Sequence, residues 1–384
     1  MNRVHSLPAT AKYRVMISCL LMVSLSGFSL GAKGAAAVSA RRAEHAPPFQ
    51  YEALSRVEFP LLMGTYLKAG LFAPFIEAAQ PAFPIPALGE GYIPQGMCHS
   101  QALGCFVLAY YYPGHKRPSL IALVDSESGV HVKSLYLLGS GGIPYTGHAG
   151  GAAAWGEHIW ITSGGRAWRL AAEDIRQAAD RSTVRFRDNF KVASRGSFAF
   201  TDGDTLWAGD YHKPEDTSGN FARQLDPGSG NMAWCAGYKL SADAPMGVAG
   251  LTRSGETPAP AAMLSLPDCV QGAATATTGE LMLSCSFTSK LPSYLWVYPS
   301  LRGMLSQAPA YEVEAAGGNV PLWVVSEGMV LRTQMIAPMS EGAASAHGKI
   351  YVVYESAALE YRERALLFAD YVFSMEESLL LAAP

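Results

Sequence analysis

The sequence predicts an all-β fold, a β-propeller of four-stranded blades, with five blades favoured and six left open. A hairpin pattern recurs along the chain: a polar residue and a glycine open a strand of small residues, and a glycine turn leads into a β-branched and aromatic strand. The fullest copy spans 340–356, and two others span 270–284 and 94–111. Internal repetition of one hairpin unit indicates a repeat architecture. The 38 glycines and 24 prolines suit many short strands joined by turns.

The first repeat contains the pattern of a whole blade. Its hairpin begins at Gln95, a third apolar strand follows at 118–125, and a fourth lies at 130–138. The residues between the last two strands are typical of a turn. Four strands in meander order are the unit from which a propeller is built.

Four more repeats follow, and they begin at His148, Arg195, Gln271 and Glu341. The second contains a short helix at 172–179. The third contains an irregular excursion at 241–262, which leaves room for a degenerate sixth blade at 247–251. The alternative is a β-sandwich whose hairpins are similar by accident.

The last repeat is incomplete. Its third strand is expected at 365–373, after which the chain nearly ends without a full outer strand. A propeller avoids a free edge by closing its ring. We therefore expect a segment upstream of Gln95 to supply the missing strand.

The first forty residues read as a signal peptide. A positively charged start precedes an apolar run at 15–30, and small residues follow, with suitable cleavage sites at 35–37 and 38–40. The alternative is an uncleaved membrane anchor. This run is slightly shorter than the stretch of about 20 residues that spans a membrane, which favours cleavage. Export to the periplasm or outside a bacterial cell is therefore predicted, with no transmembrane span after cleavage.

The predicted domains follow from these boundaries. Residues 1–40 form the signal peptide, 41–91 a linker with short helices that pack on the domain, and 92–384 the propeller. A net charge of -3 and 16% charged residues show no basic excess, which argues against nucleic acid as a partner.

Export permits disulfides. Cys98 and Cys105 flank one repeat turn and Cys269 and Cys285 flank another, so two cross-strand disulfides are expected. Cys235 is the odd cysteine, and Cys19 lies within the signal peptide. The cysteine spacing does not favour a metal cluster.

The repeat motifs carry a resemblance. The motifs at 94–96, 147–151, 206–210, 270–272 and 339–342 together resemble those of a family of exported bacterial β-propeller proteins. This resemblance covers most of the chain after residue 92 and implies the fold but no activity. Single repeats also resemble, more distantly, the NHL, gluconolactonase and strictosidine synthase-like propellers.

Blade geometry converts the repeats into a candidate site. The start of each inner strand and the loop after each second strand lie on one face, around the mouth of the central channel. The candidate ligand-binding residues on that face are Gln95, His148, Arg195, Asp210, Tyr211, Gln271, Glu341 and Glu355. Glu341 and His148 are also the candidate catalytic residues, since His148 is the best general base at this face. Each has a structural alternative, such as hydrogen bonding between blades.

Three functions remain open. The favoured one is a binding or scaffold protein whose mouth face takes a protein, a glycan or a small molecule. The second is a lactonase- or esterase-like hydrolase that uses a divalent cation, with calcium possible and Glu341 as the candidate ligand. The third is a five-bladed glycosidase, which needs carboxylates such as Glu341, Glu355 and Asp210 around the axis. After the predicted signal peptide, neither a Gly-x-Ser-x-Gly nor a His-Glu-x-x-His motif is present.

Overall fold

The computed structural model describes residues 70–213, 225–226 and 228–382. All of them belong to one compact unit that spans 46–384. The predicted signal peptide at 1–40 and most of the predicted linker lie outside the described residues. Their assignment stays a prediction from sequence.

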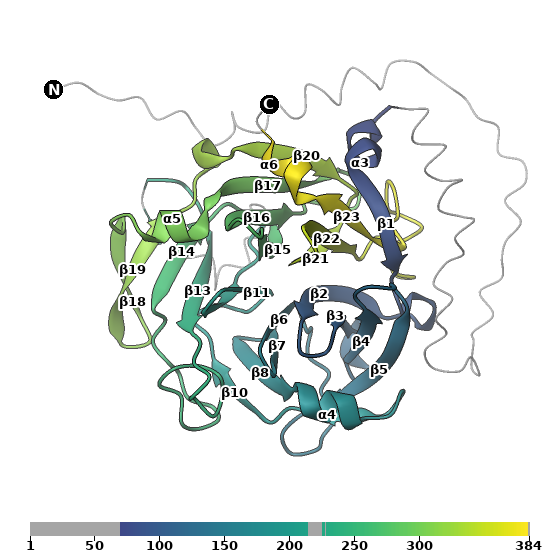
Figure 1. Ribbon diagram of the computed structural model, residues 1–384, viewed down its shortest axis with the longest axis horizontal. Helices are drawn as coiled ribbons and strands as arrows, with labels where there is room; N and C mark the ends of the chain where they lie inside the picture. The colour runs from purple at the N-terminus through teal and green to yellow at the C-terminus, as the bar shows by residue number, and fades with distance from the viewer. Residues whose placement is uncertain (1–69, 214–224, 227, 383–384) are drawn as a thin grey trace, which may run out of the picture. The chain divides into compact units, whose positions relative to one another are not determined.

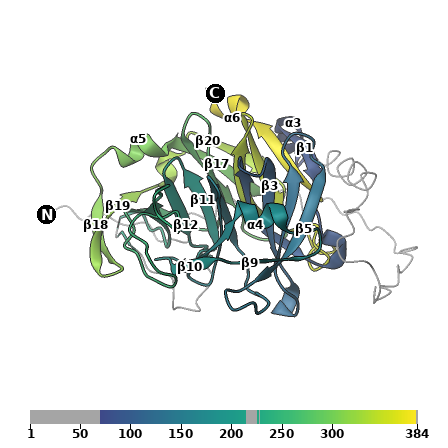
Figure 2. The same ribbon diagram turned by 60° about the horizontal axis from the view of Figure 1, so that its bottom comes forward.

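The described chain is a five-bladed β-propeller, which confirms the predicted fold class and the favoured blade number (Figure 1). The innermost strands are β2 (Ile93–Ser100), β6 (Gly151–Trp155), β11 (Phe198–Asp202), β15 (Val270–Thr275) and β21 (Ser340–Ala346). Each contacts the inner strands of both neighbouring blades, and β21 contacts β2 to complete the ring. Figure 2 shows the blades from a tilted direction, with their strands running across the depth of the ring.

In blades 1 to 4, the second, third and fourth strands follow the inner strand in chain order, and neighbouring strands within each blade are antiparallel. Blade 1 continues with β3 (Cys105–Tyr111), β4 (Leu120–Asp125) and β5 (His131–Leu138), and blade 2 with β7 (His158–Ser163), β8 (Arg166–Ala171) and β10 (Asp188–Lys191). Blade 3 continues with β12 (Thr205–Gly209), β13 (Ala233–Lys239) and β14 (Ala262–Leu266), and blade 4 with β16 (Glu280–Cys285), β17 (Ser293–Ser300) and β20 (Arg332–Ile336). Blade 5 continues with β22 (Lys349–Tyr354) and β23 (Tyr371–Glu376).

The ring closes with a strand from the N-terminal side of the repeats, as expected. Strand β1 (Ala79–Pro84) pairs antiparallel with β23 and forms the outer strand of blade 5. Its Phe83 is buried and its ring packs 5.2 Å from that of Phe106 in blade 1. Strand β1 lies within the 41–91 range, so part of that range is a blade strand. The closure leaves β23 paired on both sides.

Two features differ from the sequence-based expectation. The third strand of blade 5 is β23 at 371–376, and the apolar residues expected to begin it at 365 instead pack in a loop, where Leu367 is buried. A hairpin of β18 (Tyr311–Ala315) and β19 (Gly318–Val324) was not predicted. It extends blade 3, because β19 pairs parallel with β14. A short β9 (Thr183–Arg185) extends blade 1 in the same parallel manner.

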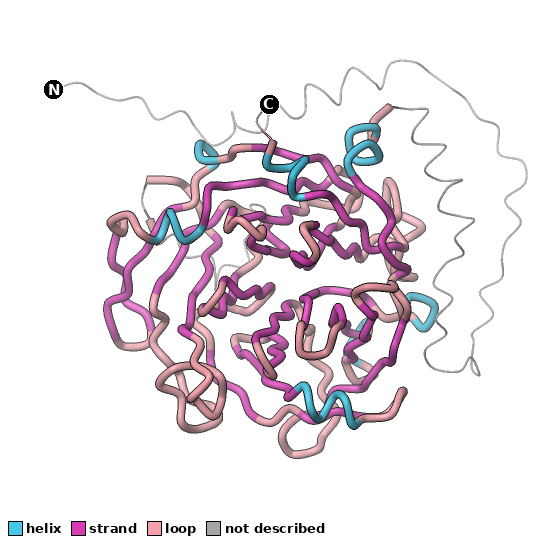
Figure 3. Tube along the Cα trace, in the orientation of Figure 1, coloured by secondary structure: helices cyan, strands magenta, loops and turns pink. Residues whose placement is uncertain are grey.

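The helices are short and lie on the periphery of the ring (Figure 3). Within the described residues they are α3 (Ala73–Ala78), α4 (Ala172–Gln177), α5 (Leu301–Leu305) and α6 (Glu377–Leu381). The same part of the chain has 3₁₀ turns at Leu88–Glu90, Pro113–His115 and Glu327–Met329. Among the residues described, no helix combines the length and the apolar composition needed to cross a membrane.

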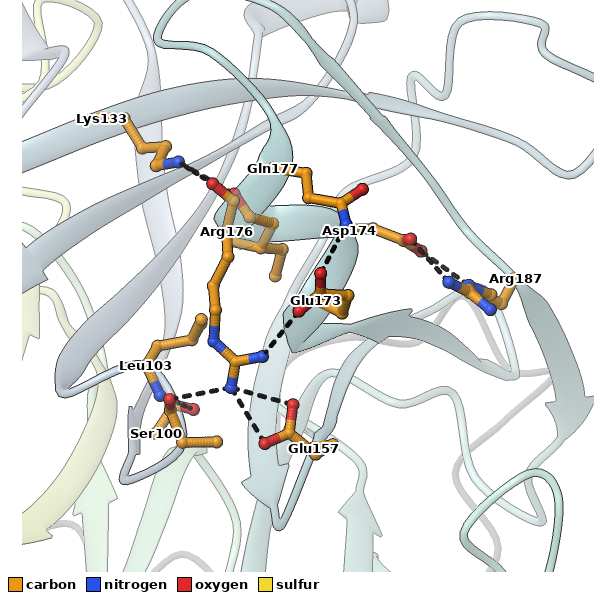
Figure 4. A network of polar contacts seen from close by, with 11 residues as sticks. Ser100, Leu103, Lys133, Glu157, Glu173, Asp174, Arg176, Gln177 and Arg187 are labelled. Carbon is orange, nitrogen blue, oxygen red and sulfur yellow. Dashed lines mark hydrogen bonds and ion pairs between the residues drawn. The ribbon is translucent and has the colours of Figure 1, made fainter.

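Helix α4, which was predicted at 172–179, ties blade 2 to blade 1 (Figure 4). Arg176 donates to the carbonyl oxygen of Ala102, in the first turn of blade 1, at 3.0 Å and pairs with Glu157 at 2.9 Å. Lys133 of β5 donates to three carbonyl oxygens at the end of the helix, those of Ile175, Arg176 and Ala178. A cation suits this end of a helix, where carbonyl groups lack backbone partners.

The apolar core is divided among the blade interfaces. Five clusters of buried side chains are present in the described chain, and each joins two neighbouring blades. The repeats therefore depend on one another, as expected for units that cannot bury their apolar faces alone.

Near the axis, the inner strands pack backbone against backbone. A Cβ atom added at Gly96 would lie 2.4 Å from the amide nitrogen of Ala152 in blade 2. One added at Gly342 would lie 2.4 Å from the amide nitrogen of Met97 in blade 1. Only glycine permits this approach, because the obstructing atoms are backbone atoms that cannot rotate away.

We predict that Gly96→Ala lowers the free energy of unfolding by about 3 kcal/mol, because overpacking against backbone forces the blades apart. Gly318→Ala is the matched control, because Gly318 lies in β19 with no atom within 4 Å of the added Cβ. Denaturant unfolding monitored by tryptophan fluorescence measures both. Equal stabilities of the two variants would contradict the backbone contact.

Candidate functional site

The mouth of the channel brings together residues that are far apart in sequence. Gln95 lies at the start of β2, and Glu355 lies just after β22. The Gln95 Nε2 atom donates to Glu355 Oε2 at 3.1 Å. Gln271 Nε2 likewise donates to Glu341 Oε1 at 2.9 Å. Inner-strand starts and second-strand ends therefore share one face.

β-Bulges direct these side chains. The pairing between first and second strands is interrupted after Pro94 in blade 1, after Val270 in blade 4 and after Ser340 in blade 5. Each interruption includes the glutamine or glutamate that precedes the repeat glycine. A bulge leaves one residue out of the ladder and redirects its side chain. Blades 2 and 3 have unbroken registers here, so the three bulged blades are consecutive in the ring.

Glu341 and Glu355 form a carboxyl pair between the two glutamines. Burial, and then the charge of Glu355, raise the pKa of Glu341 well above its usual range. Burial also raises the pKa of Glu355 to about 8, although the hydrogen bond from Gln95 and the charge of Arg364 oppose that shift. The pair therefore retains protons at neutral pH. Nearby, the hydroxyl groups of Tyr111 and Tyr361 lie 3.2 Å apart.

This donor set does not match a calcium cage in its present arrangement. Calcium takes six to eight oxygen ligands. Here, the amide nitrogens of Gln95 and Gln271 face the carboxylates, and the carboxyl groups retain protons. Among the described residues, no group of three or more His, Cys, Asp or Glu side chains is arranged to hold a metal ion. Calcium at Glu341 stays a prediction from sequence.

His148 and Arg195 do not occupy the repeat position that the sequence suggested. The contacts at the axis place Gly151 and Phe198 level with Gly96, so the residues preceding these are Gly150 and Ser197. His148 and Arg195 lie two residues earlier, in the segments that enter blades 2 and 3. The short Gly-containing motifs of blades 2 and 3 allowed either alignment, and only the packing distinguishes them.

These two residues instead line a cavity of about 540 Å³ at the entrance to blades 2 and 3. Asp210, which follows β12, lies in its wall together with Trp234 of β13. The remaining lining comes from Gly150, Ser163, Gly164, Gly165, Ala193, Ser194, Gly196 and Ser197. Three of the predicted site residues therefore share one cavity.

The polar groups of this cavity are held in place. The Arg195 backbone N–H donates to Asp210 Oδ1, and the Arg195 carbonyl accepts from Gly165 N at 2.8 Å. The Trp234 indole N–H donates to the Ala193 carbonyl at 2.9 Å. Burial raises the pKa of Asp210 to about 7, although the hydrogen bond and the charge of Arg195 lower it. The cavity wall is therefore preformed.

His148 connects the cavity with the carboxyl pair. Its ring reaches solvent and lies 4.2 Å from the ring of Tyr111, centroid to centroid. The groups packed around the imidazole and the charge of His115 lower the pKa of His148. The imidazole is therefore neutral at pH 7 and can accept a hydrogen bond or a proton.

Other residues at this face have separate surroundings. Tyr211 follows Asp210 directly but does not line the cavity. His212 Nδ1 lies 3.0 Å from Asp268 Oδ1, so its ring is oriented by a carboxylate. The sequence reading missed Trp234 and Tyr361, because the first lies on a third strand and the second in a loop with no repeat signal.

A second cavity lies along the inner strands, away from the mouth. Its volume is about 170 Å³, and alanines such as Ala153, Ala274 and Ala344 line it together with a few polar side chains, among them His99 and Thr201. The titratable candidates described above are absent from this lining. Binding chemistry is therefore concentrated at the mouth.

The predicted disulfides are not formed in the structure. All five cysteines of the described chain are buried and none takes part in a disulfide: Cys98, Cys105, Cys235, Cys269 and Cys285. The strand register explains this for the first pair, because Cys98 lies opposite Val107 and Cys105 opposite Ser100. In the second pair, Cys285 lies opposite Val270, and Cys269 has a left-handed backbone with φ of 67°.

No protein-family model matches the chain, and no curated protein sequence does. The resemblance to exported bacterial propellers therefore stays a prediction from motifs. Among solved structures, the chain is similar to the glutaminyl cyclase of Myxococcus xanthus, with 13% identity, 78% of this chain and 94% of that chain covered, and a TM-score of 0.37. It is also similar to the PQQ-bound aldose sugar dehydrogenase of Streptomyces coelicolor, with 12% identity, coverage of 77% and 96%, and a TM-score of 0.39. Likeness at this level carries no argument about function.

We predict that the five thiols remain unreactive toward a thiol reagent in the native protein, since burial raises the pKa of Cys98 to about 12 and that of Cys105 to about 11. After denaturation without reductant, all five should react, in addition to Cys19 where the first forty residues are present. If only three of the five thiols react after denaturation, one of the predicted disulfides is present, and if only one reacts, both are.

We also predict that stability falls as pH rises from about 4.5 to about 8. Over this range the carboxyl pair keeps protons in the folded protein that it has lost in the unfolded chain. The contribution of the pair to stability is therefore complete below about pH 4.5 and is lost as the pH rises. Glu341→Gln should flatten this slope by up to about 1.4 kcal/mol per pH unit, the equivalent of one proton. Melting temperatures across this range test it. Glu314→Gln, at an exposed position, is the control and should follow the wild-type slope. If the Glu341→Gln profile also runs parallel to that of the wild type, the raised pKa of the buried carboxyl pair is contradicted.

Proposed function

We propose that this protein is a binding propeller that takes a small molecule in the cavity formed by blades 2 and 3 at the channel mouth. The observation that carries the proposal is the cavity of about 540 Å³, in which Arg195, Asp210 and His148 converge with Trp234. Ligand sites are concave and combine aromatic surface with a few placed polar groups. Both features are present here.

The rigidity of the wall supports this proposal. Backbone hydrogen bonds hold the Arg195 segment to the Gly164–Gly165 turn and to Asp210, so little side-chain or loop ordering is needed when a ligand enters. Preformed sites bind more tightly because these ordering costs have been met during folding. A scaffold that binds only through its outer surface would not need such a wall.

A hydrolase is the second candidate, and the carboxyl pair favours it. Glu341 and Glu355 retain protons at neutral pH, which is the state a general acid requires. The ring of Tyr111 lies 4.2 Å from that of His148, which lines the cavity. Under this reading, Glu355→Gln abolishes turnover of a chromogenic glycoside or ester while binding in the cavity persists.

The binding proposal is tested by thermal unfolding in the presence of separate panels of neutral saccharides, carboxylates, amino acids and nucleotides. We expect at least one panel to contain a compound that raises the melting temperature, because a ligand at 100 times its Kd stabilises the folded state by about 2.7 kcal/mol. Arg195→Gln and Trp234→Phe should remove the effect.

Lys239→Gln is the control, because Lys239 is exposed and pairs with Asp204 in a turn at the opposite face. It should respond to ligand like the wild type. If no compound shifts the melting temperature, or if the shift survives in both cavity variants, the cavity is not the binding site.

A further inference from the structure

The cavity presents both signs of charge and both kinds of hydrogen-bonding group. Arg195 offers only donors, an ionised Asp210 only acceptors, and the neutral His148 ring one of each. The hydroxyl groups of Ser163 and Ser197 can act in either role. A ligand that satisfies such a wall must itself donate and accept hydrogen bonds at several points.

We infer that the ligand is an uncharged polyhydroxylated molecule, a saccharide of one or two rings. This inference rests on the proposed binding function and specifies its ligand class. Each hydroxyl group of a sugar donates one hydrogen bond and accepts others, which matches the mixed polar lining. A volume of about 540 Å³ falls within the range of small-molecule sites and accommodates a ligand of this size.

The aromatic lining fits the same class. The Trp234 side chain is 9% exposed, and its N–H is occupied by the Ala193 carbonyl, so the indole contributes apolar ring surface to the wall. A sugar ring has C–H groups that pack against such a surface while its hydroxyl groups reach polar partners. His148 contributes a second ring to the lining, and this ring packs 4.2 Å from that of Tyr111 at a tilt of 31°.

The balance of charge argues against ionic ligands. When Asp210 is ionised, its negative charge balances the positive charge of Arg195. The Asp210 carboxylate then repels an anionic ligand, and the Arg195 guanidinium repels a cationic one. Asp210 is 3% exposed, and a ligand ammonium group would have to lose its hydration to reach it. Desolvation costs far more for an ammonium group than for a hydroxyl group. This difference also disfavours an amino acid, whose two charges could otherwise pair with both residues.

The test is a titration of tryptophan fluorescence and heat at pH 8, where Asp210 is mostly ionised. The neutral probes are glucose, galactose, mannose, xylose, N-acetylglucosamine, sucrose and trehalose. The charged probes are glucuronate, lysine, glycine and glutamate. We expect saturable binding of at least one neutral saccharide, and at least tenfold weaker binding of every charged probe.

Variants locate the site. Asp210→Asn preserves an acceptor for the Arg195 N–H, so it should fold, yet it should weaken saccharide binding at least tenfold, as should Arg195→Gln. Asp268→Asn is the matched control, because Asp268 pairs with His212 at the same face and does not line the cavity. Its affinity should equal that of the wild type.

The possible results distinguish a failure of the saccharide assignment from a failure of the proposed binding function. Tighter binding of glucuronate or an amino acid through Arg195 and Asp210 overturns the saccharide assignment but leaves a binding cavity. The assignment also fails if no saccharide binds while a compound from another panel does. Saccharide binding that is unaffected by Asp210→Asn and Arg195→Gln places the ligand elsewhere and overturns both.

Discussion

The close approach of five inner strands around one axis is the constraint on which the rest of the structure depends. At Gly96 and Gly342 the neighbouring blade comes so near that no side chain fits, and the contact is between backbones. The apolar clusters between blades can pack only when this spacing is kept, because each joins two blades. The N-terminal strand β1 then completes blade 5 and prevents the ring from opening at its edge.

This ring is not symmetric at its mouth, and the asymmetry creates two different environments. Bulges in blades 4, 5 and 1 direct Gln271, Glu341 and Gln95 toward one another, so polar side chains fill that part of the mouth. Blades 2 and 3 keep a regular ladder and carry Gly150 and Ser197 at the same level. Both residues line the cavity of His148, Arg195 and Asp210.

Both environments contain buried carboxyl groups that lower the stability of the folded protein when they ionise. A carboxyl group whose pKa is raised by burial destabilises the protein in its ionised form, and this applies to Glu341, Glu355 and Asp210. Perturbed groups of this kind concentrate at functional sites. The Gln95 and Gln271 amides offset part of the cost for the pair, whereas Asp210 relies on the Arg195 segment. A ligand that hydrogen-bonds to Asp210 would offset more of it.

The sequence by itself determined the propeller, the five repeats and the face on which candidate residues gather, because strand alternation and glycine turns are local signals that recur. It also indicated that the closing strand comes from upstream. The alignment of blades 2 and 3, the cysteine register and the β18–β19 hairpin were decided only by tertiary structure. These depend on which backbone atoms meet between strands, and a shift of one residue in the pairing changes every contact that follows. For the same reason His148 and Arg195 were found as site residues, but their common cavity with Trp234 was not.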